Sequence, residues 1–238
     1  MELNIRLLLE RAARYFPDNE IVTHLPDGGL HRYTYRTLNE RAHRLASRLA
    51  SIGVRPGDRV ATLAWNTYRH FELYFALPCA GTVLHTVNLR LADEHIAYIL
   101  NHSEDSAVFV DPDLLPTLER IADHIKTVRT FVVLAGQVPA TSLPNVLAYE
   151  DLIAAGDPGF AFNELPERTP AGMCYTSATT GLPKGVVYSH RDIYLHTITE
   201  CLGDVLDIRE RDTLLPVVPM FHANAWGCRL PPLAWVPR

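Results

Sequence analysis

The chain has 238 residues, of which 47% are hydrophobic and 21% charged, a composition that can bury a sizeable core and that excludes disorder and collagen. A net charge of -5 and the scattered placement of its 22 lysines and arginines exclude nucleic acid as the main partner. No uncharged apolar run reaches the roughly 18 residues that a transmembrane helix needs. The 4 cysteines form no CxxC pair, which argues against disulfides and zinc and favours a reducing, cytoplasmic setting.

In chain order, the sequence first predicts two helices. The opening residues read as a helix rather than as a secretory signal, because acidic residues interrupt their apolar stretch. Apolar residues spaced by three and four predict a second helix over 38–52. Thr37 and Glu40 are expected to form a capping box at its start, and Gly53 stands where a helix should end.

Short strand-like stretches and a further helix follow in alternation. Buried strands are predicted at 59–64, 107–110 and 131–134, and an amphipathic helix over 96–103 precedes the second of them. Strand, helix and strand at this spacing indicate an α/β fold.

A polar connection containing proline and glycine, over 156–170, separates this alternating half from a stretch of different character. We therefore expect an alternating α/β subdomain over 1–165 and a second segment over 166–238 that belongs to the same domain.

The second segment begins with a loop rich in hydroxyls and glycines around Lys184. Short hydroxyl side chains and exposed backbone N–H groups suit a polyphosphate, and the lysine adds a charge that can reach its outer phosphates. A Ser/Thr/Gly-rich surface turn is the alternative interpretation. The loop is not a Walker A motif, because Gly185 follows the lysine. A strand is predicted over 185–189 and a helix from about Arg191, so the loop should join two strands.

Two stretches resemble a known family, the AMP-forming acyl-CoA synthetases of the adenylate-forming superfamily. Residues 175–185, YTSATTGLPKG, resemble its phosphate loop, and residues 216–227, PVVPMFHANAWG, are similar to its substrate-side motif. Weaker similarity runs through 84–91 and 96–102. These versions are most similar to the medium- and long-chain fatty-acid branch.

The resemblance implies mixed sheets flanked by helices, in an incomplete N-terminal domain of an adenylate-forming enzyme whose C-terminal domain is absent. It also implies a fatty-acid–CoA ligase. The fatty-acid carboxylate would attack the α-phosphorus of ATP to give an acyl-adenylate and pyrophosphate, and the thiol of coenzyme A would then displace AMP. Catalysis of such in-line transfer is mainly positioning and charge stabilisation.

Site residues follow from the same resemblance. The residues that would hold the departing β- and γ-phosphates are Ser177, Thr179, Thr180, Gly181 and Lys184. Thr176 would bind nucleotide and help to place Mg²⁺. His222, the implied catalytic residue, and Ala223 would lie beside the nucleotide and the carboxylate, with Trp226 near the mouth of the acyl channel. Without the resemblance, a lone histidine or tryptophan in an apolar segment is more often a packing residue.

The sequence departs from this family at two places. Ala178 stands where the family usually has glycine, and at a positive φ its methyl group would cost roughly 1 kcal/mol. We expect a weakened nucleotide site, which Ala178→Gly should strengthen. Residues 228–238 do not resemble the family, although one permissible set of codons, read in a shifted frame, encodes a family-like continuation. We therefore expect a frameshift that truncated a synthetase gene and impaired its activity, which the coding DNA beyond codon 238 tests.

Two other classes of function remain open at this point. A catalytically inactive fragment would bind nucleotide weakly or self-associate, for example as a homodimer, because truncation leaves sheet edges and apolar surface uncovered. A serine hydrolase would use Ser189, His190 and Asp192, but neighbours in sequence rarely point at one another and no GxSxG elbow occurs. His190 and His196 are poorly spaced for a metal site on one helix face.

Overall fold

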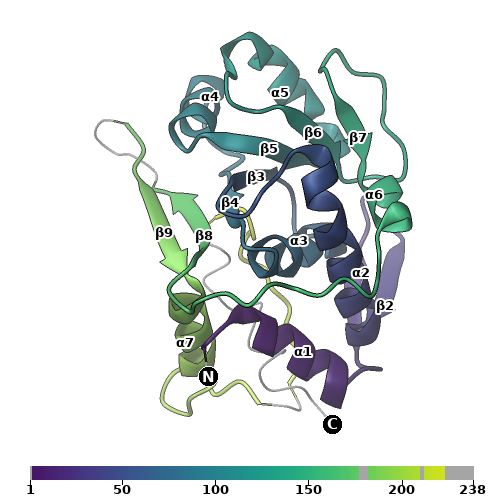
Figure 1. Cartoon of the computed structure of the whole chain (residues 1–238), viewed down its shortest axis with the longest axis vertical. Coiled ribbons are helices and arrows are strands. Elements are labelled where there is room, and N and C mark those ends of the chain that lie inside the picture. Colours follow the sequence, from purple (N-terminus) through teal and green to yellow (C-terminus); the bar gives the residue numbers. More distant parts are fainter. Residues whose placement is uncertain (1, 177–181, 210–211, 223–238) are drawn as a thin grey trace.

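The structure, a computed structural model, describes residues 2–176, 182–209 and 212–222 (Figure 1). Its main element is a seven-stranded sheet in the order β7-β6-β5-β3-β4-β8-β9, and a separate antiparallel hairpin pairs β1 with β2. All neighbours in the large sheet are parallel except β8 and β9, which run antiparallel. The expectation of an α/β fold with a mixed sheet is confirmed.

The strands are β1 (Glu20–His24), β2 (Leu30–Thr34), β3 (Arg59–Leu63), β4 (Val83–Thr86), β5 (Asp105–Val110), β6 (Thr130–Val133), β7 (Val146–Ala148), β8 (Pro170–Tyr175) and β9 (Gly185–Ser189). The α-helices are α1 (Ile5–Tyr15), α2 (Tyr35–Arg48), α3 (Tyr68–Cys79), α4 (Asp93–His102), α5 (Leu115–Arg120), α6 (Tyr149–Ala155) and α7 (His190–Glu200). Short 3-10 helices in the described residues span Leu49–Ile52, Pro112–Leu114 and Ala122–His124.

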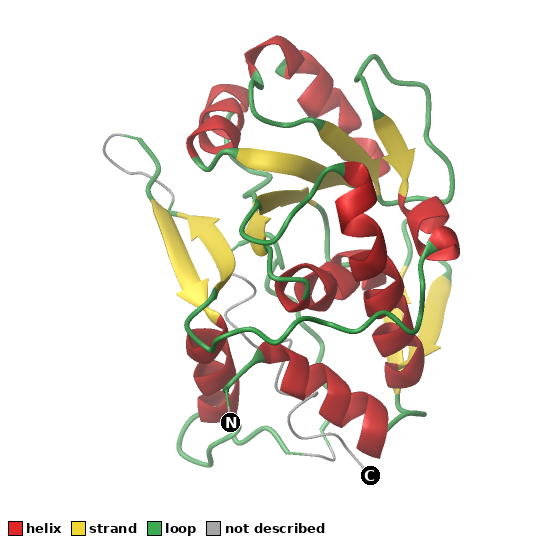
Figure 2. Cartoon of the chain, in the orientation of Figure 1, coloured by secondary structure: helices red, strands yellow, loops and turns green. Residues whose placement is uncertain are grey.

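Helices cover both faces of the large sheet (Figure 2). Each face has its own apolar core. Val60 and Phe109 belong to the core built with α1, α2, α3 and α6. Their neighbours Ala61 and Val108 belong to the opposite core, built with α4 and α5. Successive side chains of a strand point to opposite faces, so strands covered on both sides are apolar at most positions. This explains the continuous apolar runs in the sequence.

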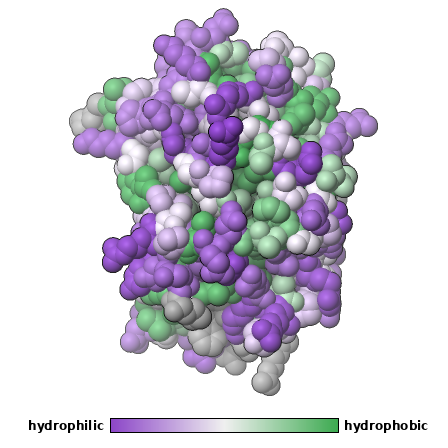
Figure 3. Space-filling model, in the orientation of Figure 1, coloured by the Kyte–Doolittle hydropathy of each residue, from purple (hydrophilic) through white to green (hydrophobic). Residues whose placement is uncertain are grey.

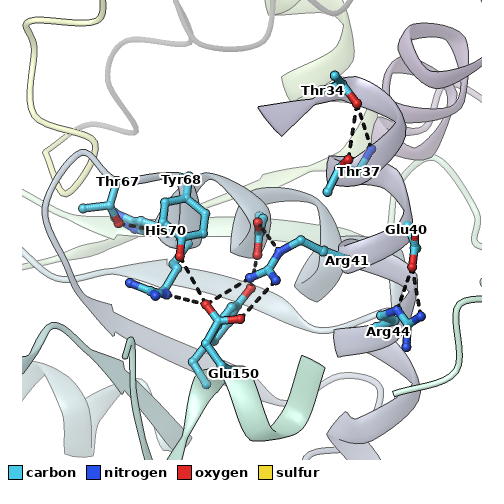
Figure 4. Close-up of polar contacts among 12 residues, drawn as sticks. Thr34, Thr37, Glu40, Arg41, Arg44, Thr67, Tyr68, His70 and Glu150 are labelled. Carbon is cyan, nitrogen blue, oxygen red and sulfur yellow. Dashed lines mark hydrogen bonds and ion pairs between the residues drawn. The ribbon is translucent and has the colours of Figure 1, made fainter. Parts of the chain in front are cut away.

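The start of α2 differs from the prediction. Thr34, in extended conformation at the end of β2, is the N-cap, and its side chain accepts the backbone N–H of Thr37. The capping box predicted at Thr37 and Glu40 is therefore wrong, because another threonine three residues earlier supplies the same hydroxyl. Glu40 instead pairs with Arg44 on the next turn (Figure 4). Gly53 does end the helical segment, with a left-handed φ of 82°.

A partly buried charge network joins α2, α3 and α6. Arg41 lies 2.7 Å from Glu72 and 3.0 Å from Glu150, which also accepts from Arg69 (Figure 4). The Glu72 side chain is fully buried, and Tyr149 donates its hydroxyl to the second carboxylate oxygen at 2.6 Å. Burial raises the pKa of Glu72 to about 7, against the attraction of Arg41. The three helices therefore share a set of charges that cannot be separated without leaving one of them unpaired.

The surface mixes polar and apolar residues on the face drawn in Figure 3. No helix of the described ranges is long and apolar enough to cross a membrane. Some large apolar side chains are nonetheless strongly exposed, among them Leu215 at 84% and Val217 at 80%. The stretch that carries the second predicted motif thus shows apolar side chains that the described residues do not cover.

Candidate functional site

The predicted phosphate loop connects β8 to β9, and the expectation that it joins two strands is confirmed. The antiparallel ladder ends with the pair Tyr175 and Gly185 and continues by one bond, from the Thr176 backbone N–H to the Lys184 carbonyl at 3.0 Å. The Thr176 hydroxyl also accepts the Lys184 backbone N–H at 3.4 Å. Thr176 and Lys184 therefore face each other across the mouth of the loop.

Of the predicted site residues, Thr176, Lys184 and His222 are described. The others lie outside the described residues: Ser177, Thr179, Thr180, Gly181, Ala223 and Trp226, together with Ala178.

Tyr175 fixes the base of the loop. A Cβ atom at Gly185 would lie 3.2 Å from the Tyr175 ring, so the opposite strand passes closely over that ring. The Tyr175 hydroxyl lies 2.7 Å from Nδ1 of His102, the last residue of α4. Burial raises the pKa of Tyr175 to about 12, which keeps the hydroxyl protonated. The loop therefore starts from a side chain held by another element, a contact that no local pattern in the sequence reveals.

A buried polar group lies beside this tyrosine. The ring of His85, on β4, is 5.2 Å from the Tyr175 ring, and its Nδ1 is 2.7 Å from Asp105 Oδ2. Ser103 donates to the same carboxylate oxygen at 2.5 Å. The side chains of His85 and Asp105 are fully buried. The group therefore supports the packing beneath the loop rather than facing a substrate.

The second predicted motif lies against the loop that follows β3. Met220 and Phe221 are buried, and the Phe221 ring meets the Trp65 ring edge-on at 5.7 Å. The Tyr74 hydroxyl of α3 donates to the Met220 carbonyl at 2.6 Å. His222 follows directly and is exposed. In Figure 1 the yellow end of the described chain accordingly runs past α3.

Both motifs are anchored at one edge of the sheet. Thr176 follows β8 and Trp65 follows β3, and both strands run parallel to β4, which lies between them. Open α/β sheets bind ligands outside the carboxyl ends of their parallel strands. Asp111, directly after β5, lies at the same edge and accepts the Trp65 backbone N–H at 2.7 Å. Burial raises the pKa of Asp111 to about 7, a feature that sequence reasoning missed.

The residues considered for a serine hydrolase form a helix cap instead. The Ser189 hydroxyl donates to Asp192 at 2.7 Å, and Ser189 accepts the Asp192 backbone N–H, which completes a capping box at the start of α7. Nδ1 of His190 accepts the backbone N–H of Ile5, so this ring nitrogen is engaged with α1. His196 pairs with Glu200. Within the described ranges no group of three or more His, Cys, Asp or Glu could hold a metal ion.

His190 should make stability depend on pH. It is fully buried, and burial lowers its pKa from 6.5 to about 4. Between these values the unfolded chain binds more protons than the folded chain, so stability falls as pH decreases. From this group we expect the free energy of unfolding to be about 2 kcal/mol lower at about pH 5 than at about pH 7.

Urea unfolding of the wild type and of His190→Asn at both pH values measures this contribution. The pH dependence that the variant loses is the part that comes from His190. His196→Gln, on the same helix but exposed, is the matched control and should keep the wild-type difference. An equal pH dependence in the wild type and in His190→Asn would contradict the assignment.

Comparison with known proteins identifies relatives along nearly the whole chain. The profile of one family, described as AMP-binding enzyme, matches residues 9–235. A long-chain-fatty-acid–CoA ligase of Thermus thermophilus is 50% identical over 226 residues, which cover 94% of this chain and 40% of the relative. A medium-chain-fatty-acid–CoA ligase of Ectopseudomonas oleovorans is 44% identical, over 95% of this chain and 42% of the relative. The chain therefore spans about two-fifths of the length of these relatives.

Solved structures agree with this result. The N-terminal domain of FACL13 from Mycobacterium tuberculosis superposes with a TM-score of 0.80 at 26% identity, over 98% of this chain and 55% of that one. A long-chain-fatty-acid–CoA ligase from Archaeoglobus fulgidus has the same fold, with a TM-score of 0.84 at 19% identity. The described fold is thus part of the N-terminal domain of acyl-CoA ligases. Because the family profile matches almost every residue of the sequence, the chain belongs to the family of AMP-binding enzymes.

Proposed function

We propose that the chain carries the phosphate-binding part of a fatty-acid–CoA ligase, which activates a medium- or long-chain fatty acid with ATP and passes the acyl group to coenzyme A. The observation that carries this proposal is the mouth of the β8–β9 loop. There Thr176 and Lys184 face each other at the carboxyl edge of the sheet, in a loop of hydroxyls and glycines. The fatty-acid–CoA ligases among its relatives support the substrate class.

In this proposal the phosphate loop binds the β- and γ-phosphates as pyrophosphate leaves. Lys184 brings the positive charge, and Ser177, Thr179, Thr180 and Gly181 bring hydroxyls and backbone N–H groups. The exposed Thr176 hydroxyl contacts Lys184 at long distances of 3.4 and 3.5 Å, and it is an oxygen of the kind that Mg²⁺ accepts. Bound Mg²⁺ would neutralise phosphate charge.

Three residues of the second motif complete the proposal. His222, exposed at the end of an otherwise anchored segment, is the proposed catalytic residue beside the carboxylate. Ala223 would contact the nucleotide and Trp226 the acyl chain. We also propose that residues 1–165 and 166–238 are parts of one domain, since β8 of the second part pairs with β4 of the first. The free cysteines Cys79, Cys174 and Cys201 favour a cytoplasmic setting.

Pyrophosphate release from ATP·Mg²⁺ by the purified chain tests the proposal, with fatty acids of several lengths and with or without coenzyme A. We expect release that depends on the acid and that is lost in Lys184→Ala, because the departing phosphates lose their cation. Lys126→Ala removes an exposed lysine far from the loop in sequence and should leave release unchanged. Acid-dependent release that survives in Lys184→Ala would contradict the role of the loop.

A second candidate is an inactive fragment that binds nucleotide weakly or self-associates. It is favoured by β9, an edge strand of the large sheet on which Val187 is 53% exposed. Light scattering and binding of a fluorescent dye to apolar surface separate the two candidates. An inactive chain whose light scattering gives the mass of a dimer or larger species, and which binds the dye, supports the second candidate. An active monomer with little dye binding contradicts it.

A further inference from the structure

The backbone around the second motif is held by a side chain rather than by secondary structure. Residues 212–222 include no helix or strand, so their backbone groups need other partners. Nδ2 of Asn66 donates to the carbonyls of Pro216 at 2.9 Å and of Val218 at 3.1 Å. Its Oδ1 accepts the backbone N–H of Met220 at 2.6 Å. One amide side chain thus satisfies three backbone groups within five residues of a segment about 150 positions away.

Asn66 is itself on a fixed backbone. The preceding residue, Trp65, donates its backbone N–H to Asp111 at 2.7 Å and its indole N–H to Asp113 at 2.9 Å. The Trp65 carbonyl lies 3.0 Å from Nδ1 of His70, whose ring is fully buried. These contacts join the loop after β3 to the end of β5 and to α3. The amide therefore projects from a site with little freedom of its own.

We propose that Asn66 is a positioning residue that fixes His222 at the carboxyl edge of the sheet. The last Asn66 contact is at the backbone of Met220, and the buried Phe221 is the one residue between Met220 and His222. Both the donor and the acceptor group of the Asn66 amide are used, so neither alanine nor aspartate can replace it. Aspartate has the same shape but loses both donors and turns a carboxylate toward two carbonyls. The role of His222 in this inference rests on the proposed function, whereas the anchoring does not.

Amide hydrogen exchange tests the anchoring without any assay of activity. In Asn66→Ala, exchange at Met220 should become about tenfold faster or more, because its acceptor is gone, while β3 and α3 keep their wild-type rates. Asn66→Asp, nearly isosteric, should speed exchange across 216–222 in the same direction. Asn4→Ala, which removes a buried asparagine that caps α1, is the matched control and should leave this segment unchanged. Unchanged rates in 216–222, or an equal rise throughout the chain, would overturn the inference.

A double-mutant cycle tests whether Asn66 acts through His222. In the wild-type background Asn66→Ala should lower acid-dependent pyrophosphate release at least about tenfold without changing the KM for ATP. In a His222→Ala background the same substitution should have little further effect, because the residue being positioned is gone. A loss in the double variant that equals the sum of the two single losses in free energy would contradict the positioning role. Should the wild-type chain release no pyrophosphate, the proposed function fails and hydrogen exchange alone decides whether Asn66 anchors the segment.

Discussion

Arg41→Ala should lower the free energy of unfolding by about 3–5 kcal/mol, the range measured when one partner of a buried ion pair is removed. Glu72 has no exposed side-chain surface and would lose the cation 2.7 Å away. Glu150 would keep Arg69 but lose its second arginine. Because burial already raises the pKa of Glu72 to about 7, the variant should respond by protonating Glu72. The loss of stability should therefore be smaller at about pH 5 than at about pH 8.

Urea unfolding at both pH values measures this effect. Arg36→Ala is the matched control on the same helix, since Arg36 is 65% exposed and pairs with an exposed Asp18. Exposed pairs contribute about 0–1 kcal/mol, so the control should change little. If Arg41→Ala and Arg36→Ala were destabilised equally, the network would not hold the three helices together as inferred.

Gly156→Ala should lower the free energy of unfolding by about 3 kcal/mol or more. The φ and ψ of Gly156, -78° and 154°, suit any residue, so its backbone conformation does not require glycine. The constraint is space, because an added Cβ would lie 2.3 Å from the Arg44 carbonyl oxygen. The obstacle is the backbone of α2, which cannot move as the end of a flexible side chain can. Helix α2 and the end of α6 would have to separate.

Gly136→Ala provides the comparison, since Gly136 is exposed and nothing lies within 4 Å of an added Cβ. A surface change of this kind is expected to alter stability by no more than about 0.5 kcal/mol. Thermal or urea unfolding of both variants distinguishes steric exclusion from a general effect of replacing glycine. Similar losses in the two variants would show that the close approach at Gly156 is not what limits that position.

The parts of the fold that could be predicted are those determined by residues close together in the sequence. The continuous apolar runs around Val60 and Val108 predict strands covered on both faces, and the structure has them. The loop before Gly185 was correctly predicted to join two strands, because a strand-like pattern follows it directly. The start of α2 was placed wrongly because threonines at 34 and 37 offer the same cap, and only the end of β2 decides between them.

Long-range contacts of the candidate site could not be predicted. Asn66 and Pro216 are 150 positions apart, and an asparagine in a loop gives no signal of the backbone it will meet. His102 and Tyr175 are 73 positions apart, and the sequence suggested only a family resemblance around the histidine. Glu72 lies between Phe71 and Leu73 in α3, and the burial of its carboxylate becomes intelligible only once Arg41 and Tyr149 are placed beside it.

The contact between Ile5 and His190 has a consequence for synthesis of the chain. The two residues are separated by 185 positions, so a nascent polypeptide can make this bond only after β9 has left the ribosome. Glu2 and Leu3 also reach forward, to Glu167. Closing so long a loop costs entropy and slows folding. Helix α1 therefore reaches its full set of neighbours only after His190 has been made, and its contact there completes the support of the hairpin that bears Lys184.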